Sequence, residues 1–157
     1  MNIIKGKTAY IVIIIFILIL LSGKLFAQSN DIVDELLLEE EASFGKTAYL
    51  VLIASNLISE DATIDNAVSE VQEQGWKIET RGNNEPIKLG ELSLMLMKSL
   101  EINGGIMYKI TSNARYACRE LSYLGLVIGN NSPYRTLSGE EALMFISRVI
   151  AWKQNQS

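Results

Sequence analysis

The stretch TLSGEEALMFISRVI, residues 136–150, combines a short turn, a glutamate at the start of a helical pattern and an apolar run. Fifty residues earlier, PIKLGELSLMLMKSL at 86–100 has the same order. In the later stretch Ser138 and Glu141 have the spacing of a capping box. The serine hydroxyl accepts a hydrogen bond from the glutamate amide, and the glutamate carboxylate accepts one from the serine amide. Both stretches therefore predict a helix that begins directly after a turn.

The similarity between the two stretches extends to the segments that precede them. Two helix–loop–helix units result, at about 63–102 and 111–152, and 44–57 matches the second helix of the unit at an offset of 45 residues. Periods of this size are typical of helical units that bury their faces against one another. We therefore predict a mainly α fold, with a small helical domain at 44–157 preceded by an acidic helix at 28–43. An offset of 50 pairs identical residues: Ala67 with Ala117, Glu70 with Glu120, Gly75 with Gly125, Ile78 with Ile128, and Glu91 with Glu141.

Several of the matched residues have a structural explanation. Gly75 and Gly125 follow the first helix of each unit, where glycine allows the left-handed conformation that ends a helix. Glu91 and Glu141 stand in the first turn of the second helices, where the helix dipole favours a negative charge. No general base, nucleophile or metal ligand accompanies these glutamates, so we interpret them, with Ser138, as structural. No catalytic residue is predicted, and we expect the protein not to be an enzyme.

Charge and composition narrow the function further. Residues 28–100 carry 14 acidic and 5 basic side chains, whereas 101–157 carry 4 acidic and 6 basic ones. This distribution lacks the concentrated basic face of a nucleic-acid-binding protein. The chain has no histidine and a single cysteine, Cys118, which we expect to be a buried thiol. No metal site, cofactor or internal disulfide is predicted.

The N-terminal residues 1–27 have the layout of a secretory signal peptide. Lys5 and Lys7 precede an apolar run at 9–22, and Leu25-Phe26-Ala27 precedes Gln28 as a cleavage site. The run of about 14 residues is shorter than the roughly 20 that a transmembrane helix needs. We expect export to the periplasm or cell envelope, with an uncleaved N-terminal anchor as the alternative and the only predicted membrane contact.

Residues 114–152, with ARYACRELSYLGLVIG followed by TLSGEEALMFISRVIAW, resemble the S-layer homology module, and 66–100 resemble it more weakly. The resemblance lies in the AxxAxxxLxxxGI helix ending, the glycine-containing loop and the glutamate of the Thr-Arg-Ala-Glu start of the second helix. It implies an exported protein whose modules bind cell-wall glycans, with clusters of three modules shaping the pockets. Both helix starts here keep the glutamate but lack the arginine at the second position of that motif.

Two functions remain open at this point. The first is a non-catalytic module that binds another envelope protein, and the second is a module that binds an acidic cell-wall polymer. The oligomeric state is not predicted. Arg135 stands where the first unit has Glu85, so we expect an anion to prefer the second unit. The candidate ligand-binding residues are Tyr134, Arg135, Arg148 and Lys88.

Overall fold

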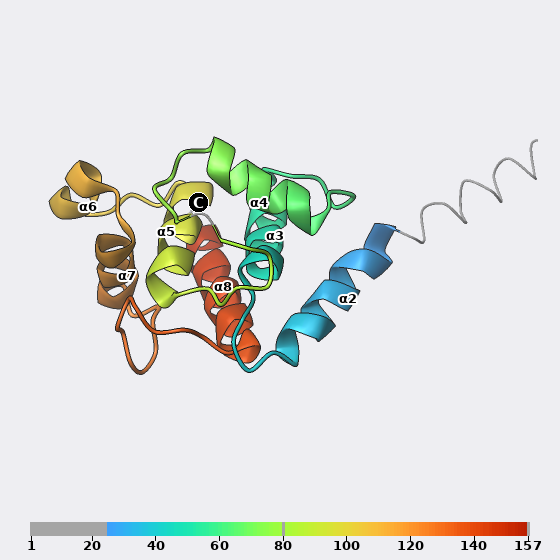
Figure 1. Cartoon of the computed structure of the whole chain (residues 1–157). Helices are drawn as coiled ribbons and strands as arrows, with labels where there is room; N and C mark the ends of the chain where they lie inside the picture. The colour runs from blue at the N-terminus through green and yellow to red at the C-terminus, as the bar shows by residue number, and fades with distance from the viewer. Residues whose placement is uncertain (1–24, 80, 157) are drawn as a thin grey trace, which may run out of the picture.

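The computed structural model describes residues 25–79 and 81–156, and this part of the chain is mainly helical, as predicted (Figure 1). It contains seven helices and no strand. The predicted signal segment lies outside the described residues except for its last three, which begin the first described helix. The helices are α2 (Leu25–Leu37), α3 (Phe44–Ala54), α4 (Ile64–Glu73), α5 (Leu89–Ser99), α6 (Ile106–Thr111), α7 (Ala114–Tyr123) and α8 (Gly139–Gln154).

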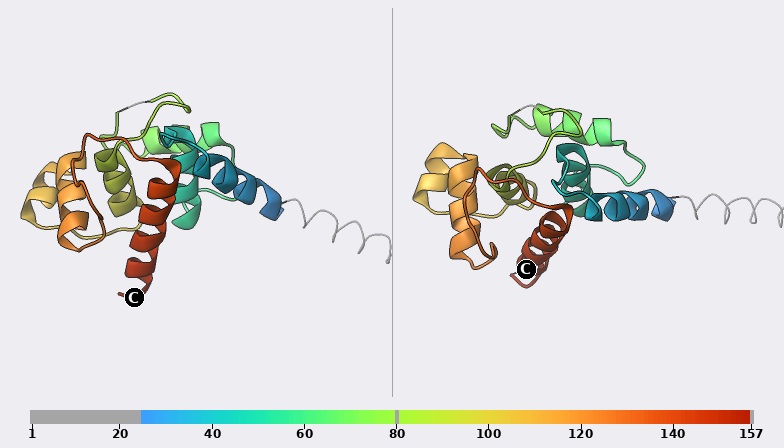
Figure 2. Two further views of the ribbon diagram at one scale, coloured as in Figure 1. Left: turned by 90° about the horizontal axis from the view of Figure 1, so that it is seen from below. Right: turned by 60° about the horizontal axis from the view of Figure 1, so that its bottom comes forward.

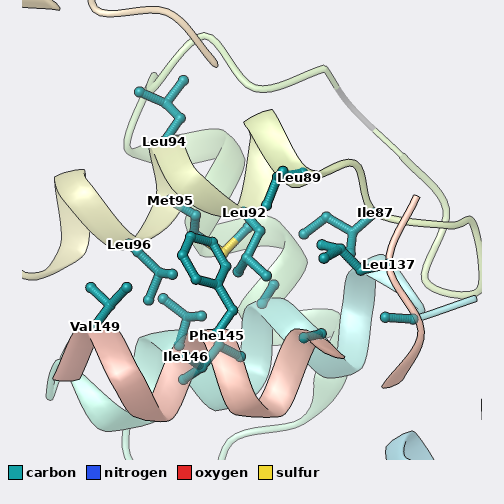
Figure 3. Close-up of a cluster of buried hydrophobic side chains, with 14 of the residues drawn as sticks. Ile87, Leu89, Leu92, Leu94, Met95, Leu96, Leu137, Phe145, Ile146 and Val149 are labelled. Carbon is teal, nitrogen blue, oxygen red and sulfur yellow. The ribbon is translucent and has the colours of Figure 1, made fainter. Parts of the chain in front are cut away.

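The most deeply buried helix is α5, which packs against α3, α7 and α8. Of its 11 residues only Lys98 is not buried, which fits a sequence that is apolar on nearly all sides. Its Leu92, Met95 and Leu96 point toward α8, which contributes Phe145, Ile146 and Val149 to the core (Figure 3). The second helix of the first predicted unit therefore lies in the core, and that of the second unit contributes one buried face to it.

The remaining long helices pack outside this centre. Helix α4 packs against α3, α7 against α5, and α2 against both α3 and α8. Figure 2 shows α6 and α7 together at one side of the molecule and α2 at the opposite side. Helix α2 buries Ile32 and Leu36 and exposes Asp31, Asp34 and Glu35, so its acidic side chains face solvent.

The two predicted glycine caps are present. Gly75 has φ +63° and Gly125 has φ +73°, both in the left-handed region. After α7, the amide of Gly125 donates to the Ser122 carbonyl at 3.0 Å, and the amide of Leu126 donates to the Leu121 carbonyl at 2.9 Å. This pair of bonds satisfies carbonyls at the helix end and buries Leu126.

Two predicted helix boundaries are wrong. The acidic helix was expected at 28–43, but α2 begins at Leu25 and ends at Leu37. Helix α5 was expected to reach 102, but it ends at Ser99, because Glu101 adopts φ +51°. Its turn is closed by a 2.8 Å bond from the Ile102 amide to the Met97 carbonyl, which brings Ile102 into the core. The helix therefore ends at a left-handed glutamate, not at a glycine, and the turn is stabilised by burial of the Ile102 side chain.

Residues 106–110, which lie between the two predicted units, form part of α6. Tyr108 is buried, whereas Ile106, Met107 and Ile110 are exposed. The helix is short because Ser112 takes up a left-handed conformation with φ +45°.

The segments that precede α3, α5 and α8 are joined by backbone hydrogen bonds. The first helical amide of each helix donates to a neighbouring segment: Phe44 to the Glu85 carbonyl at 2.8 Å, Leu89 to Arg135 at 2.9 Å, and Gly139 to Glu39 at 3.0 Å. Further bonds run from the Ala42 amide to the Leu137 carbonyl and from the Ile87 amide to the Ala42 carbonyl. Amides that a helix leaves unpaired at its start are thus satisfied by other segments, and the three starts lie together.

Candidate functional site

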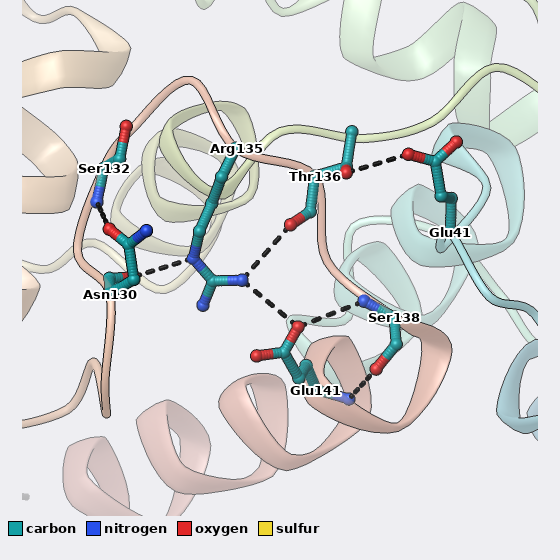
Figure 4. A network of polar contacts seen from close by, with 7 residues as sticks. All are labelled: Glu41, Asn130, Ser132, Arg135, Thr136, Ser138 and Glu141. Carbon is teal, nitrogen blue, oxygen red and sulfur yellow. Dashed lines mark hydrogen bonds and ion pairs between the residues drawn. The ribbon is translucent and has the colours of Figure 1, made fainter.

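The predicted capping box forms at the start of α8. The Ser138 hydroxyl accepts a hydrogen bond from the Glu141 amide at 3.2 Å, and the Glu141 carboxylate accepts one from the Ser138 amide at 3.2 Å (Figure 4). The same carboxylate oxygen accepts from Nη1 of Arg135 at 3.1 Å. Glu141 therefore connects the helix start to the preceding loop.

Arg135 holds this loop in place through three groups. Its Nε donates to the Asn130 carbonyl at 2.7 Å, and its Nη1 donates to the Thr136 carbonyl at 3.2 Å as well as to Glu141. Partial burial disfavours the charged form of Glu141, but the hydrogen bonds from Arg135 and the Ser138 amide and the charge of Arg135 outweigh it. Together they lower the pKa of Glu141 below its ordinary value.

The start of α5 uses the same elements in a more buried setting. The Glu91 carboxylate accepts from the Lys88 amide at 2.9 Å and from Nε of Arg81 at 3.0 Å. Lys88 stands where α8 has serine and offers no side-chain oxygen to an amide, so only the carboxylate half of the box is made. Arg81 also pairs with Glu79 and Glu85, and its side chain is 12 % exposed. Sequence reasoning did not identify Arg81, because the loop lengths differ between the units and place this arginine at another distance from its glutamate.

The start of α3 reaches a similar arrangement with residues in a different order. The Glu39 carboxylate accepts from the Ser43 amide at 2.7 Å and from the Lys46 ammonium at 2.9 Å, and Lys46 also pairs with Glu35. Burial disfavours ionisation of Glu39, but the hydrogen bonds from Lys46 and Ser43 and the charge of Lys46 lower its pKa overall. At all three helix starts, a carboxylate thus accepts a hydrogen bond from the amide of the capping residue and also pairs with a cation.

A pocket of about 210 Å³ opens beside the start of α8; we call it the apolar pocket. Arg135 and Arg148, two of the predicted ligand residues, both line it. Arg148 donates from Nη1 to the Leu126 carbonyl at 2.7 Å. Within the described part of the chain no carboxylate lies within ion-pair distance of Arg148. The lining residues are Leu89, Val127, Ile128, Arg135, Leu137, Glu141, Met144, Phe145 and Arg148.

The other two predicted residues lie elsewhere. Tyr134, although it precedes Arg135 in sequence, is 71 % exposed and lines a different hollow on the α7 side. Lys88 is half-buried at the start of α5 and lines neither hollow. The hollow beside Tyr134, called here the basic groove, is lined by Arg115, Arg119, Ser122, Asn131, Ser132, Pro133 and Tyr134.

Cys118 is buried, as expected from the sequence. Its thiol donates to the Asn131 carbonyl at 3.4 Å. Burial raises the pKa of this thiol, and hydrogen bonds with Ser93 and Ser122 and the charge of Arg135 only partly offset that effect. A thiol in these surroundings is a poor nucleophile.

In 25–79 and 81–156, histidine, cysteine, aspartate and glutamate nowhere gather in a group of three that suits a metal ion. No helix in this part of the chain has the length and apolar character to cross a membrane.

Comparisons of the chain with known protein families, with curated proteins and with solved structures found no match.

Proposed function

We propose that this protein is an exported, non-catalytic module of the cell envelope that binds another protein through the apolar pocket. One observation carries the proposal: an open, largely apolar hollow with exposed large side chains at its rim, Ile128 at 66 % and Met144 at 49 %. Its volume of about 210 Å³ is below the roughly 300–1,000 Å³ of small-molecule sites. That size suits one anchoring side chain of a protein partner, the usual centre of a binding hot spot.

The non-catalytic part of the proposal rests on how the polar groups of the pocket are used. Glu141 accepts from an amide and from Arg135, and Arg135 holds two backbone carbonyls. General acid–base catalysis needs a group that is free to exchange a proton with substrate near the working pH. A carboxylate whose pKa is lowered by these contacts stays ionised and occupied.

We further propose that the domain consists of three units that resemble S-layer homology modules: α2–α3, α4–α5 and α7–α8. The equivalent hydrogen bonds at the starts of α3, α5 and α8 support this interpretation. Helix α2 supplies a first helix for α3, although it packs on α8 as well as on α3. Export belongs to the proposal too, since it depends on the predicted signal segment 1–27, of which residues 1–24 lie outside the described part.

A photo-crosslinking experiment in the native cells tests the protein-binding function. A benzophenone amino acid at Met144 is expected to link the module to one envelope protein, identified by mass spectrometry. The matched control places the same amino acid at Leu38, which is 87 % exposed and lies between α2 and α3. Equal crosslinking from both positions, or crosslinking to glycan alone, would contradict the proposal.

An acidic cell-wall polymer remains a second candidate, and the basic groove favours it. Arg115 and Arg119 are exposed there, and the ion pairs of the described residues include neither of them. Tyr134 adds an exposed aromatic face on which a sugar ring can stack.

Retention on protein-free cell-wall material tests this second candidate. Arg119→Glu is a cleaner variant than Arg135→Glu, because Arg135 also holds the loop before α8. If the polymer is the ligand, Arg119→Glu lowers retention at low salt and Met144→Asp leaves it unchanged. Absence of retention by the unaltered protein would remove the glycan function.

A further inference from the structure

We propose that the apolar pocket recognises an acidic peptide segment, in which a large apolar side chain is followed directly by an aspartate or glutamate. The apolar side chain fills the pocket, and the carboxylate pairs with Arg148. This inference rests on the proposed function, because it names the chemistry of the partner at the same site.

The apolar half of the inference follows from the walls of the pocket. Leu89, Leu137 and Phe145 are almost fully buried and form its inner part, whereas Ile128 and Met144 are exposed at the rim. A partner side chain placed between them removes apolar surface from water on both molecules, which is the main favourable term in association.

A comparison of α5 with α8 indicates that no other part of the described chain covers this apolar surface. Leu94 of α5 and Met144 of α8 each lie six residues after the capping residue of their helix. Leu94 is fully buried and points away from α8 toward the loop that precedes α5 (Figure 3). Met144 is 49 % exposed. The chain itself covers the position on α5, and the equivalent position on α8 is left for a partner.

The charged half of the inference follows from Arg148. The lining of the pocket contains two cations and one anion, and the anion, Glu141, is already paired with Arg135. Arg148 uses one of its five N–H donors in a hydrogen bond to the Leu126 carbonyl, and this bond holds the guanidinium at the pocket. A planar guanidinium held in this way is suited to a carboxylate, which it can bind through two parallel hydrogen bonds.

Short blocked peptides test the inference by NMR. The probes are acetyl-Gly-Phe-Asp-Gly-amide, its Phe-Asn and Ala-Asp counterparts, and a galacturonate trimer. The reporter is the ¹³C-labelled methyl group of Met144, and the internal control is the methyl group of Met107, which is exposed on α6 away from the pocket. We expect the Phe-Asp peptide to shift Met144 but not Met107, and the Phe-Asn peptide to bind about fivefold more weakly, as for a partly exposed ion pair.

Arg148→Gln separates charge recognition from a purely structural role of Arg148. Glutamine can still donate a hydrogen bond to the Leu126 carbonyl but carries no charge. We expect this variant to bind the Phe-Asp peptide only as well as the Phe-Asn peptide, with the affinity for Phe-Asn unchanged. Arg119→Gln, which removes a charge from the basic groove, is the matched control and should retain the preference for Phe-Asp.

Each other outcome overturns the inference in a distinct way. Equal binding of the Phe-Asp and Phe-Asn peptides removes the role of the carboxylate but leaves a protein-binding apolar pocket. A shift of Met144 by the galacturonate trimer alone assigns the pocket to an acidic glycan. If no probe shifts Met144, the acidic-peptide inference fails, and crosslinking from Met144 decides the proposed function separately.

Discussion

The starts of α5 and α8 are built from the same local parts and differ in what surrounds them. Each has a glutamate on the capping amide, an arginine from the preceding loop on that glutamate, and a backbone bond to a neighbouring segment. Glu91 is buried and its arginine has three carboxylate partners, whereas the Glu141 side chain is 45 % exposed and its arginine has one. The apolar pocket with its unneutralised Arg148 lies at the second start.

The difference shows that the helix start itself does not make the candidate site. Capping bonds and a paired glutamate are found at both places, and they satisfy backbone groups at both. The site arises where the loop before the helix leaves the side of α8 around Met144 uncovered. The candidate site therefore differs from the start of α5 in how much of its apolar surface the chain covers and in its balance of charges, and each can be changed separately.

The largest expected effect comes from the glycines where another segment crosses the helix start. A Cβ on Gly139 would overlap the Leu36 carbonyl oxygen, and a Cβ on Gly90 would lie 2.9 Å from the Pro133 carbonyl oxygen. We expect Gly139→Ala to lower the free energy of unfolding by about 3 kcal/mol and Gly90→Ala by about 1–2 kcal/mol, as for overpacked sites. Urea unfolding measures both changes.

Gly82→Ala is the matched control for these variants. A Cβ at Gly82 meets only the flexible side chain of Glu85, at 3.3 Å, so its effect should stay within about 0.5 kcal/mol. If Gly139→Ala is as mild as Gly82→Ala, the end of α2 is not tightly held against α8.

The second comparison removes the arginine from each helix start. Arg81→Ala leaves Glu91 buried without its cation, and we expect a loss of roughly 3 kcal/mol, the scale for a broken buried ion pair. Arg135→Ala leaves Glu141 in contact with solvent and removes two hydrogen bonds to backbone carbonyls, so it should cost less, about 1–2 kcal/mol. Thermal unfolding at pH 7 measures both. Equal losses would mean that the difference in burial has no energetic consequence.

The third prediction concerns how the stability contributed by Glu141 depends on pH. The pKa of Glu141 is lowered by folding, so its stabilising contribution is complete above the ordinary value of 4.5 and is lost as the pH falls through the folded value. We expect Arg135→Ala to raise the pKa of Glu141 toward its ordinary value, because the hydrogen bond and charge of Arg135 are removed. NMR titration of the side-chain carboxyl carbon measures this shift. An unchanged pKa would show that the Ser138 amide alone is responsible.

The smallest effect concerns local opening around Cys118. Its thiol is buried under the segment that crosses Gly90, so it should react slowly with a thiol reagent in the folded protein and rapidly in denaturant. Gly90→Ala displaces Pro133 and should speed the reaction more than Gly139→Ala does, once both are corrected for global stability. Equal corrected rates would show that the 131–133 segment opens only with the whole domain.

Sequence reasoning reached part of the candidate site. Arg135 and Arg148 were both predicted to bind the ligand, and the structure brings them to one pocket. Tyr134 lines a different hollow, and Lys88 lines neither of the two. Tyr134 and Arg135 lie in a turn and line different hollows, so their proximity in sequence did not imply a shared site. Arg81 was missed, because its partner Glu91 is ten positions away across a loop of irregular conformation.

The sequence by itself determined the features that depend on one helical turn. Ser138 and Glu141 are three residues apart, so their reciprocal bonds need only local backbone, and Gly125 adopts the left-handed conformation because it lacks a side chain. The mainly helical fold follows from such caps and from apolar spacing. Only the tertiary structure decided that the three helix starts join through backbone bonds and that Met144 stays open while Leu94 is covered. Those outcomes depend on contacts between segments that are 41 to 100 residues apart in the sequence, where differences in loop length outweigh the similarity of the helices.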